Sequence, residues 1–122
     1  MTRAGTGKTY ASAFAMRELG FKKVLFLVHR EQILKQAQAS YKKVLPSDIS
    51  TGLLSGNYKE IEADYLFSTI QTMSRSNMLE NFERDRFECI IIDETHKAGA
   101  ESYHKIINYF KPKLLLGMTA SP

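Results

Sequence analysis

Gly5-Thr6-Gly7-Lys8-Thr9 is the strongest local signal in this 122-residue chain, and it decides the fold class. Glycines at these positions let backbone N–H groups come close to phosphate oxygens. Lys8 offers a positive charge to the outer phosphates of a nucleotide, and the Thr9 hydroxyl suits a magnesium ion. The segment therefore predicts a phosphate-binding loop at the start of a helix. The alternative is an ordinary flexible turn.

The segment matches only the later part of the usual phosphate-loop pattern. The first glycine of that pattern would stand where this chain has Thr2, and Arg3 and Ala4 then precede Gly5. Such a loop normally joins a central strand to a helix, and no strand-forming run stands before it here. We therefore expect a domain that lacks its first strand because upstream sequence is absent.

Hydrophobic spacing beyond the loop predicts a helix, a strand and a second helix. The first helix is expected at 8–19, with Gly20 as its stop. Val24–Val28 is a continuous apolar run of β formers, typical of a strand buried on both faces of a parallel sheet. Apolar residues share one helical face over 31–45, and Pro46 ends that pattern. The residues at helical spacing on the first helix are Ala11, Phe14, Ala15 and Leu19.

The rest of the chain alternates between strand and helix patterns. Further strands are expected at 51–54, 65–69, 88–92 and 114–116, and Gly56-Asn57 separates the first two. Helices are expected at 70–82 and at 103–110, where Pro112 closes the second one. Strands that alternate with helices imply a mainly parallel sheet covered on both faces. The sequence therefore predicts one three-layer α/β domain.

A pair of acids follows the expected buried strand at 88–92. The segment reads Asp93-Glu94-Thr95-His96. Open α/β sheets bind ligands at the carboxyl ends of their strands, and adjacent carboxylates repel each other there unless a cation is present. Asp93 therefore suits a magnesium ion, and Glu94 suits the orientation of an attacking water. The alternative is that both acids only cap the next helix.

Five short segments stand in a fixed order along the chain. They are Gly5-Thr6-Gly7-Lys8-Thr9, Val28-His29-Arg30-Glu31-Gln32, Ser68-Thr69-Ile70-Gln71-Thr72, Asp93-Glu94-Thr95-His96 and Gly117-Met118-Thr119-Ala120-Ser121-Pro122. They resemble motifs I, Ia, Ib/Ic, II and III of superfamily-two DEAD/DEAH-type helicases. The nearest resemblance is to the bacterial group related to type III restriction subunits. It covers nearly the whole chain and implies the N-terminal RecA-like P-loop NTPase domain.

The resemblance implies roles for individual residues. ATP would be held by the loop residues Gly5, Thr6, Gly7, Lys8 and Thr9. Thr9 and Asp93 would hold Mg²⁺, while Glu94 and Lys8 would be catalytic. Coupling of the nucleotide site to motion would fall to His96, Thr119 and Ser121.

The resemblance also implies a surface for nucleic acid, expected to be DNA. The residues concerned lie at strand ends or helix starts: His29, Arg30, Thr69, Gln71 and Thr72. Backbone N–H groups and hydroxyls at such places suit phosphate oxygens. The alternative is a solvated pair for His29 and Arg30 and a surface amide for Gln71.

The implied activity is that of the ATP-binding half, at 1–122, of an ATP-hydrolysing helicase or translocase. Its partner would be a second RecA-like domain, absent from this chain, that supplies an arginine finger. We therefore expect the chain alone to be inactive and prone to self-association. One alternative is a nucleotide- or nucleic-acid-binding module without turnover. Another is a P-loop NTPase of a different kind, which the segments at 93–96 and 119–121 disfavour.

Composition agrees with a cytoplasmic globular domain. The net charge of +4 favours contact with a polyanion, but basic and acidic residues are interleaved. The single cysteine, Cys89, rules out an internal disulfide, and its apolar surroundings predict a buried, inert thiol. No apolar run reaches the ~20 residues of a membrane span, so no membrane partner is expected.

Overall fold

The structure, a computed structural model, describes residues 4–75, 77–93 and 100–118. Its helices are α1 (Ala4–Leu19), α2 (Glu31–Val44), α3 (Ile70–Met73) and α4 (Ala100–Tyr109), with a 3-10 helix η1 (Leu79–Asn81). Its strands are β1 (Val24–Val28), β2 (Thr51–Ser55), β3 (Tyr58–Lys59), β4 (Tyr65–Thr69), β5 (Cys89–Asp93) and β6 (Leu114–Met118). They form one sheet in the order β3-β2-β4-β1-β5-β6, in which only the β2–β3 pair is antiparallel. The predicted mainly parallel α/β fold is confirmed.

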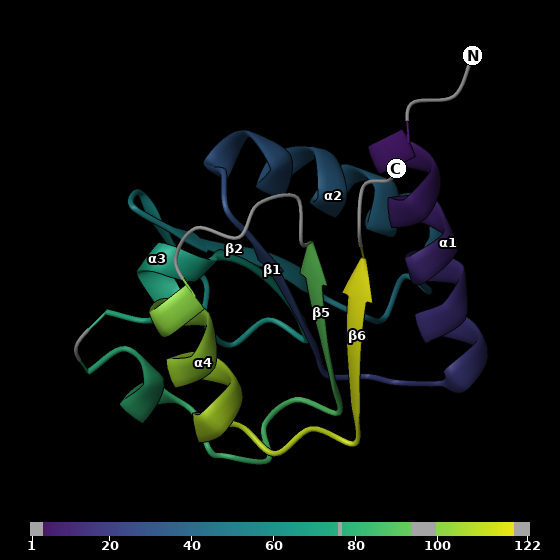
Figure 1. Cartoon of the computed structure of the whole chain (residues 1–122). Helices are drawn as coiled ribbons and strands as arrows, with labels where there is room; N and C mark the ends of the chain where they lie inside the picture. Colours follow the sequence, from purple (N-terminus) through teal and green to yellow (C-terminus); the bar gives the residue numbers. More distant parts are fainter. Residues whose placement is uncertain (1–3, 76, 94–99, 119–122) are drawn as a thin grey trace.

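Two hydrophobic clusters, one on each face of the sheet, produce three layers (Figure 1). Side chains alternate along a strand, so Val24, Phe26 and Val28 of β1 belong to the cluster under α1 and α2. Leu25 and Leu27 belong to the cluster under α3 and α4. All five residues are at most 1% exposed, as predicted for a strand covered on both faces. The continuous apolar run of β1 is therefore the centre of the core.

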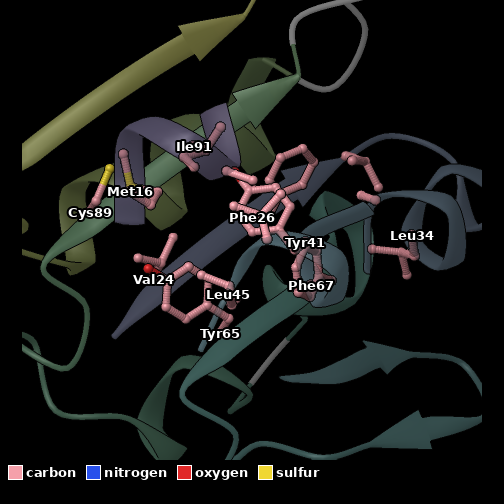
Figure 2. Close-up of a cluster of buried hydrophobic side chains, with 14 of the residues drawn as sticks. Met16, Val24, Phe26, Leu34, Tyr41, Leu45, Tyr65, Phe67, Cys89 and Ile91 are labelled. Atoms are coloured by element: carbon pink, nitrogen blue, oxygen red, sulfur yellow. The ribbon is translucent and has the colours of Figure 1, made fainter. Parts of the chain in front are cut away.

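Cys89 begins β5 inside the first cluster, close to Met16 of α1 (Figure 2). Burial raises the pKa of this thiol to about 11, so it stays protonated at neutral pH. The predicted buried thiol is confirmed. No helix in the described ranges is long and apolar enough to cross a bilayer.

Two carboxylates hold the amino ends of the parallel strands together. Glu88 Oε1 accepts hydrogen bonds from the backbone N–H groups of Lys22 (2.7 Å) and Lys23 (3.2 Å), just before β1. Asp64 forms an ion pair with the Lys23 ammonium and accepts a hydrogen bond from the Ser50 N–H (3.0 Å). Burial raises the pKa of Asp64, but the bonds from Lys23 and Ser50 outweigh burial and leave the pKa below its ordinary value. These contacts place the start of β1 level with its neighbours.

The first helix differs from its prediction in two ways. It begins at Ala4 rather than at residue 8, so the Gly5–Thr9 segment is helical instead of a loop. A glycine costs a helix only ~1 kcal/mol relative to alanine, which the continuing hydrogen-bond ladder can offset. Its buried face is also not the expected one, because Phe14 and Leu19 are 51% and 56% exposed. The buried residues are Ser12, Ala13 and Met16, which are compact enough for α1 to pack closely on α2.

The predicted helix at 70–82 is wrong in extent. α3 ends at Met73, and η1 is a separate turn further on. Between them Asn77 adopts a positive φ of 70°, which a continuous right-handed helix excludes. The short antiparallel strand β3 was not predicted, because Gly56-Asn57 was taken only as a separator. No strand precedes α1 among the described residues. The other predicted helices and strands agree with the structure to within two or three residues at each end.

A matched pair of glycines in and beside β2 tests this packing. A Cβ on Gly52 would lie 2.7 Å from Ala63 Cβ and 2.9 Å from Glu60 Cβ, whereas one on Gly56 would meet nothing within 4 Å. We expect Gly52→Ala to lower the free energy of unfolding by ~1–3 kcal/mol through overpacking. Gly56→Ala should leave it unchanged or slightly higher. Urea unfolding midpoints measure both, and equal midpoints for the two variants would contradict the close approach at Gly52.

Candidate active site at the carboxyl edge of the sheet

The strand register brings distant segments to one edge of the sheet. Val28, the last residue of β1, pairs with Thr69, the last residue of β4. On the other side Leu27 pairs with Ile92, and Asp93 at the end of β5 pairs with Met118 at the end of β6. Segments that are far apart in sequence therefore follow neighbouring strand ends. Open α/β sheets place their ligands at such an edge.

The amino end of α1 lies at the same edge as the arrowheads of β5 and β6 (Figure 1). The helix starts at Ala4 and contains Gly5–Thr9, and Lys8 and Thr9 are half-buried. The first N–H groups of a helix lack intrahelical acceptors and carry partial positive charge, which favours an anion. The predicted phosphate residues are therefore on the correct side of the sheet. Their helical backbone is not a loop curled around a phosphate, so binding of that kind requires the first turn to open at Gly5 and Gly7.

Oxygen donors for a cation are present at this edge. Asp93 is half-buried at the end of β5, and Thr9 lies in α1. Magnesium is usually held by one or two protein oxygens together with substrate phosphates and waters, and this donor set fits that chemistry. Among the described residues no group of three or more His, Cys, Asp or Glu side chains converges on a metal position. The predicted residues Glu94, His96, Thr119 and Ser121 lie outside the described ranges.

The turn between β1 and α2 carries two of the predicted nucleic-acid residues. His29 is half-buried, whereas Arg30 is exposed and caps α2 without a side-chain hydrogen bond to its N–H groups. A surface hollow of about 590 Å³ is lined by Arg30, Glu31, Gln32 and Lys35. Hydrogen bonding with Tyr58 raises the pKa of Lys35, and its ammonium lies 5.2 Å from the centre of that ring. Two cationic side chains therefore flank this hollow.

The β4–α3 turn presents a different surface from the one expected. Thr69 and Thr72 are 6% and 4% exposed, and Thr69 Oγ1 donates to Thr72 Oγ1 over 2.8 Å. Thr69 Oγ1 also accepts from the Thr72 N–H at 3.2 Å, so it caps α3. Gln71 is exposed. The structure thus brings Arg30 and Gln71 to the surface and uses the two hydroxyls to hold the turn; their contact with nucleic acid stays a prediction.

Sequence reasoning passed over the β2–β3 turn, which lies at this same edge. β2 runs parallel to β4, so Ser55 and the turn residues Gly56 and Asn57 follow a strand end next to that of β4. Asn57 is exposed, and within the described residues the buried Ser55 hydroxyl has no hydrogen-bond partner. The dipeptide Gly56-Asn57, a hairpin turn signal, could have revealed it.

Comparison with known families identifies the family to which this chain belongs. Residues 2–122 match the family described as "Type III restriction enzyme, res subunit". The chain belongs to this family. The match, to what we call the res family, includes all five motif-like segments of the sequence. The predicted domain type, the N-terminal RecA-like domain of superfamily-two helicases, is therefore confirmed.

Two curated relatives extend the res-family assignment. The chain is 37% identical over 100 residues to "Putative ATP-dependent helicase IRC3" of Saccharomyces cerevisiae, which covers 80% of this chain. It is 28% identical over 132 residues to "Type I restriction enzyme SsaAORF53P endonuclease subunit" of Staphylococcus saprophyticus, which covers 97% of it. The chain spans only 14% of the length of each of these relatives. They are therefore much larger proteins that contain a segment similar to this one.

Solved structures share the res-family fold at lower identity. The Pyrococcus furiosus Hef helicase domain superposes with a TM-score of 0.65 at 21% identity, covering 99% of this chain and 33% of that one. The Sulfolobus solfataricus SWI2/SNF2 ATPase core, solved in complex with double-stranded DNA, gives 0.59 at 16% identity over 98% of this chain and 32% of that one. These likenesses confirm the fold of the sheet that supports the edge.

Replacing Arg30 or Lys113 by alanine removes one positive charge in either case, so the two variants together test the nucleic-acid prediction. Lys113 precedes β6 at the opposite edge of the sheet, and its side chain is 75% exposed. We expect Arg30→Ala in the full-length protein to weaken binding of a single-stranded oligonucleotide. It should also lower the slope of log K against log salt by about one unit or less, since one phosphate contact is lost. Lys113→Ala should change neither, and equal effects from both variants would make Arg30 a solvated surface residue.

Proposed function

We propose that this chain is the ATP-binding half of a motor that couples ATP hydrolysis to movement on DNA in a longer parent protein. The observation that carries the proposal is that three kinds of group meet at one edge of the sheet. These are the amino end of α1, the Asp93 carboxylate and the exposed Arg30 at the start of α2. Membership of the res family and the helicase names of its relatives support the same function.

Each group at the edge has a separate chemical task in this proposal. Lys8 and the first N–H groups of α1 would bind the phosphates of ATP. Thr9 and Asp93 would hold Mg²⁺, which supplies charge neutralisation along the phosphates. Glu94 would orient the attacking water, and His96, Thr119 and Ser121 would link this site to the partner domain. The reaction is phosphoryl transfer to water, in which a protein acts mainly by positioning and electrostatic stabilisation.

DNA is the proposed track. The Sulfolobus solfataricus neighbour with this fold was solved bound to double-stranded DNA, and restriction endonuclease subunits are among the relatives. Arg30 and Lys35 outnumber the one carboxylate, Glu31, in the β1–α2 hollow, and cationic side chains suit a phosphate backbone. A protein that binds DNA phosphates and ATP at the same edge of its sheet can change its affinity for the DNA strand when the bound nucleotide changes.

The second candidate is a nucleotide- or nucleic-acid-binding module without turnover. The observation that favours it is the helical first turn of α1, since Gly5–Thr9 do not form a phosphate loop as described. In the motor proposal this turn opens when nucleotide binds, and the partner domain supplies the arginine finger. A finger of this kind is worth ~10³–10⁵ in rate. Hydrolysis by the full-length protein therefore separates the two candidates.

Two substitutions test the motor proposal in the full-length protein. Glu94→Gln should lower ATP turnover at least ~100-fold, because the attacking water loses its acceptor, while ATP is still bound. Lys8→Ala should lower both turnover and ATP affinity through loss of a phosphate-pairing charge. Lys22→Ala, an exposed lysine at the opposite edge, is the charge control and should behave as wild type. Unchanged steady-state turnover after Glu94→Gln would show that the catalytic assignment is wrong.

A further prediction concerns the 122-residue chain by itself. We expect phosphate release near background, with and without single-stranded DNA, because in this proposal the arginine finger comes from a second domain. We also expect self-association, since Phe14 and Leu19 of α1 and Leu114 and Leu115 of the outermost described strand are exposed. Sedimentation velocity reports the mass, and Leu115→Lys should shift it toward the monomer. Robust DNA-stimulated turnover from a monomeric chain would contradict both expectations.

A further inference from the structure

A buried hydrogen bond joins α1 to α2. The Ser12 and Tyr41 hydroxyl oxygens lie 2.6 Å apart, and the two residues are 5% and 0% exposed. Ser12 Oγ also donates to the backbone carbonyl oxygen of Thr9 at 2.7 Å. A serine hydroxyl has a single hydrogen, so the hydrogen between the two side chains belongs to Tyr41. The result is a directed chain that runs from the Tyr41 O–H through the Ser12 O–H to the Thr9 carbonyl.

The two ends of this hydrogen-bond chain lie in the nucleotide segment of α1 and on α2. Thr9 lies in the segment assigned to ATP and Mg²⁺, one helical turn before Ser12. Tyr41 lies near the carboxyl end of α2, about three helical turns from Arg30 at the amino end of the same helix. The Tyr41–Ser12 bond therefore connects the backbone of the nucleotide segment to the helix that presents the nucleic-acid residue.

The Tyr41 ring is held firmly in place by the sheet. Its centroid lies 5.6 Å from that of Phe26 on β1 and 5.2 Å from that of Phe67 on β4, both at near-perpendicular angles (Figure 2). Tyr65 adds a third ring at 5.9 Å. Burial raises the pKa of the Tyr41 hydroxyl, so it remains a hydrogen donor at neutral pH. Its oxygen is therefore a fixed point relative to β1 and β4.

α1 packs on the core through a few side chains, including the partly buried Tyr10 and Ala15. Phe14 and Leu19 on its outer side are exposed, and Ala13 and Met16 are its fully buried apolar side chains among the described residues. Arg17 adds a long bond of 3.5 Å from Nη1 to the Val44 carbonyl at the far end of the helix. The Ser12–Tyr41 bond is thus a buried polar contact that helps to set how α1 sits against α2.

We infer that Tyr41 is a positioning residue that, through Ser12, couples the nucleotide segment to α2, the helix that carries Arg30 at its amino end. The inference rests on the proposed function, since it assigns a link between the two ligands of that same site. Because the Tyr41 oxygen is held against the sheet, its bond to Ser12 would restrain the Thr9 backbone when nucleotide binds, and a change in the position of α2 on DNA binding would alter that restraint. By linkage, DNA binding must change nucleotide affinity by the same factor.

The test measures this coupling factor in the full-length protein. The factor is the Kd of a fluorescent, non-hydrolysable ATP analogue without single-stranded DNA, divided by its Kd at saturating DNA. Tyr41→Phe and Ser12→Ala each remove the bond from one side. We expect each to bring the factor ~3–10-fold closer to one, the range of a buried neutral hydrogen bond. Nucleotide affinity without DNA should stay within about twofold of wild type in both variants.

Tyr65→Phe is the matched control. The Tyr65 hydroxyl donates to the Phe21 carbonyl at 2.6 Å in the same aromatic cluster, so its loss removes the same atoms and a similar bond. It should lower stability much as Tyr41→Phe does and leave the coupling factor unchanged. A merely structural role for Tyr41 would make the two tyrosine variants alike.

The outcomes separate the inference from the function beneath it. Wild-type coupling that survives Tyr41→Phe, or that is lost in only one of Tyr41→Phe and Ser12→Ala, would overturn the inference alone. Equal loss of coupling in Tyr65→Phe would also overturn it. A wild-type protein that binds no ATP analogue, or binds it without any response to DNA, would overturn the proposed function and the inference with it.

Discussion

Burial of β1 on both faces and both sides is the constraint on which the rest of the structure depends. Val24–Val28 has no polar side chain, so the strand is stable only where helices cover both faces and strands satisfy both rows of its backbone groups. α1 and α2 supply one cover, and α3 and α4 the other. β4 and β5 supply the hydrogen bonds, which requires crossover connections and hence the three-layer arrangement.

The candidate site follows from the same constraint. Parallel strands in register end together, so β1 carries Arg30, β4 carries Gln71 and β5 carries Asp93 to one edge. The amino ends of α1 and α2 point to that edge, and each brings the partial positive charge of its free N–H groups. Strand register thus brings polar groups from distant segments to one edge. The carboxylates of Asp64 and Glu88 at the opposite edge help to hold that register.

Sequence reasoning succeeded where one physical signal dominates. The apolar run of β1 and the amphipathic spacing of α2 leave few alternatives, and the strand ends that they imply located Asp93, Arg30 and Gln71. It failed where tertiary context decides. Spacing alone suggested Phe14 and Leu19 as the buried face of α1, but close packing on α2 selects the small residues and Met16 instead. Burial of Thr69 and Thr72 depends on a local cap that motif matching does not reveal.

The pairing of β1 also governs how the chain folds during synthesis. Val24 pairs with Tyr65 on one side and with Cys89 on the other, and both partners emerge from the ribosome much later. Until β5 has emerged, β1 lacks one of its two neighbours, and its apolar side chains stay accessible to other proteins. Contacts of such sequence separation fold slowly. Before β5 is synthesised, the apolar side chains of β1 therefore lack part of the sheet that covers them.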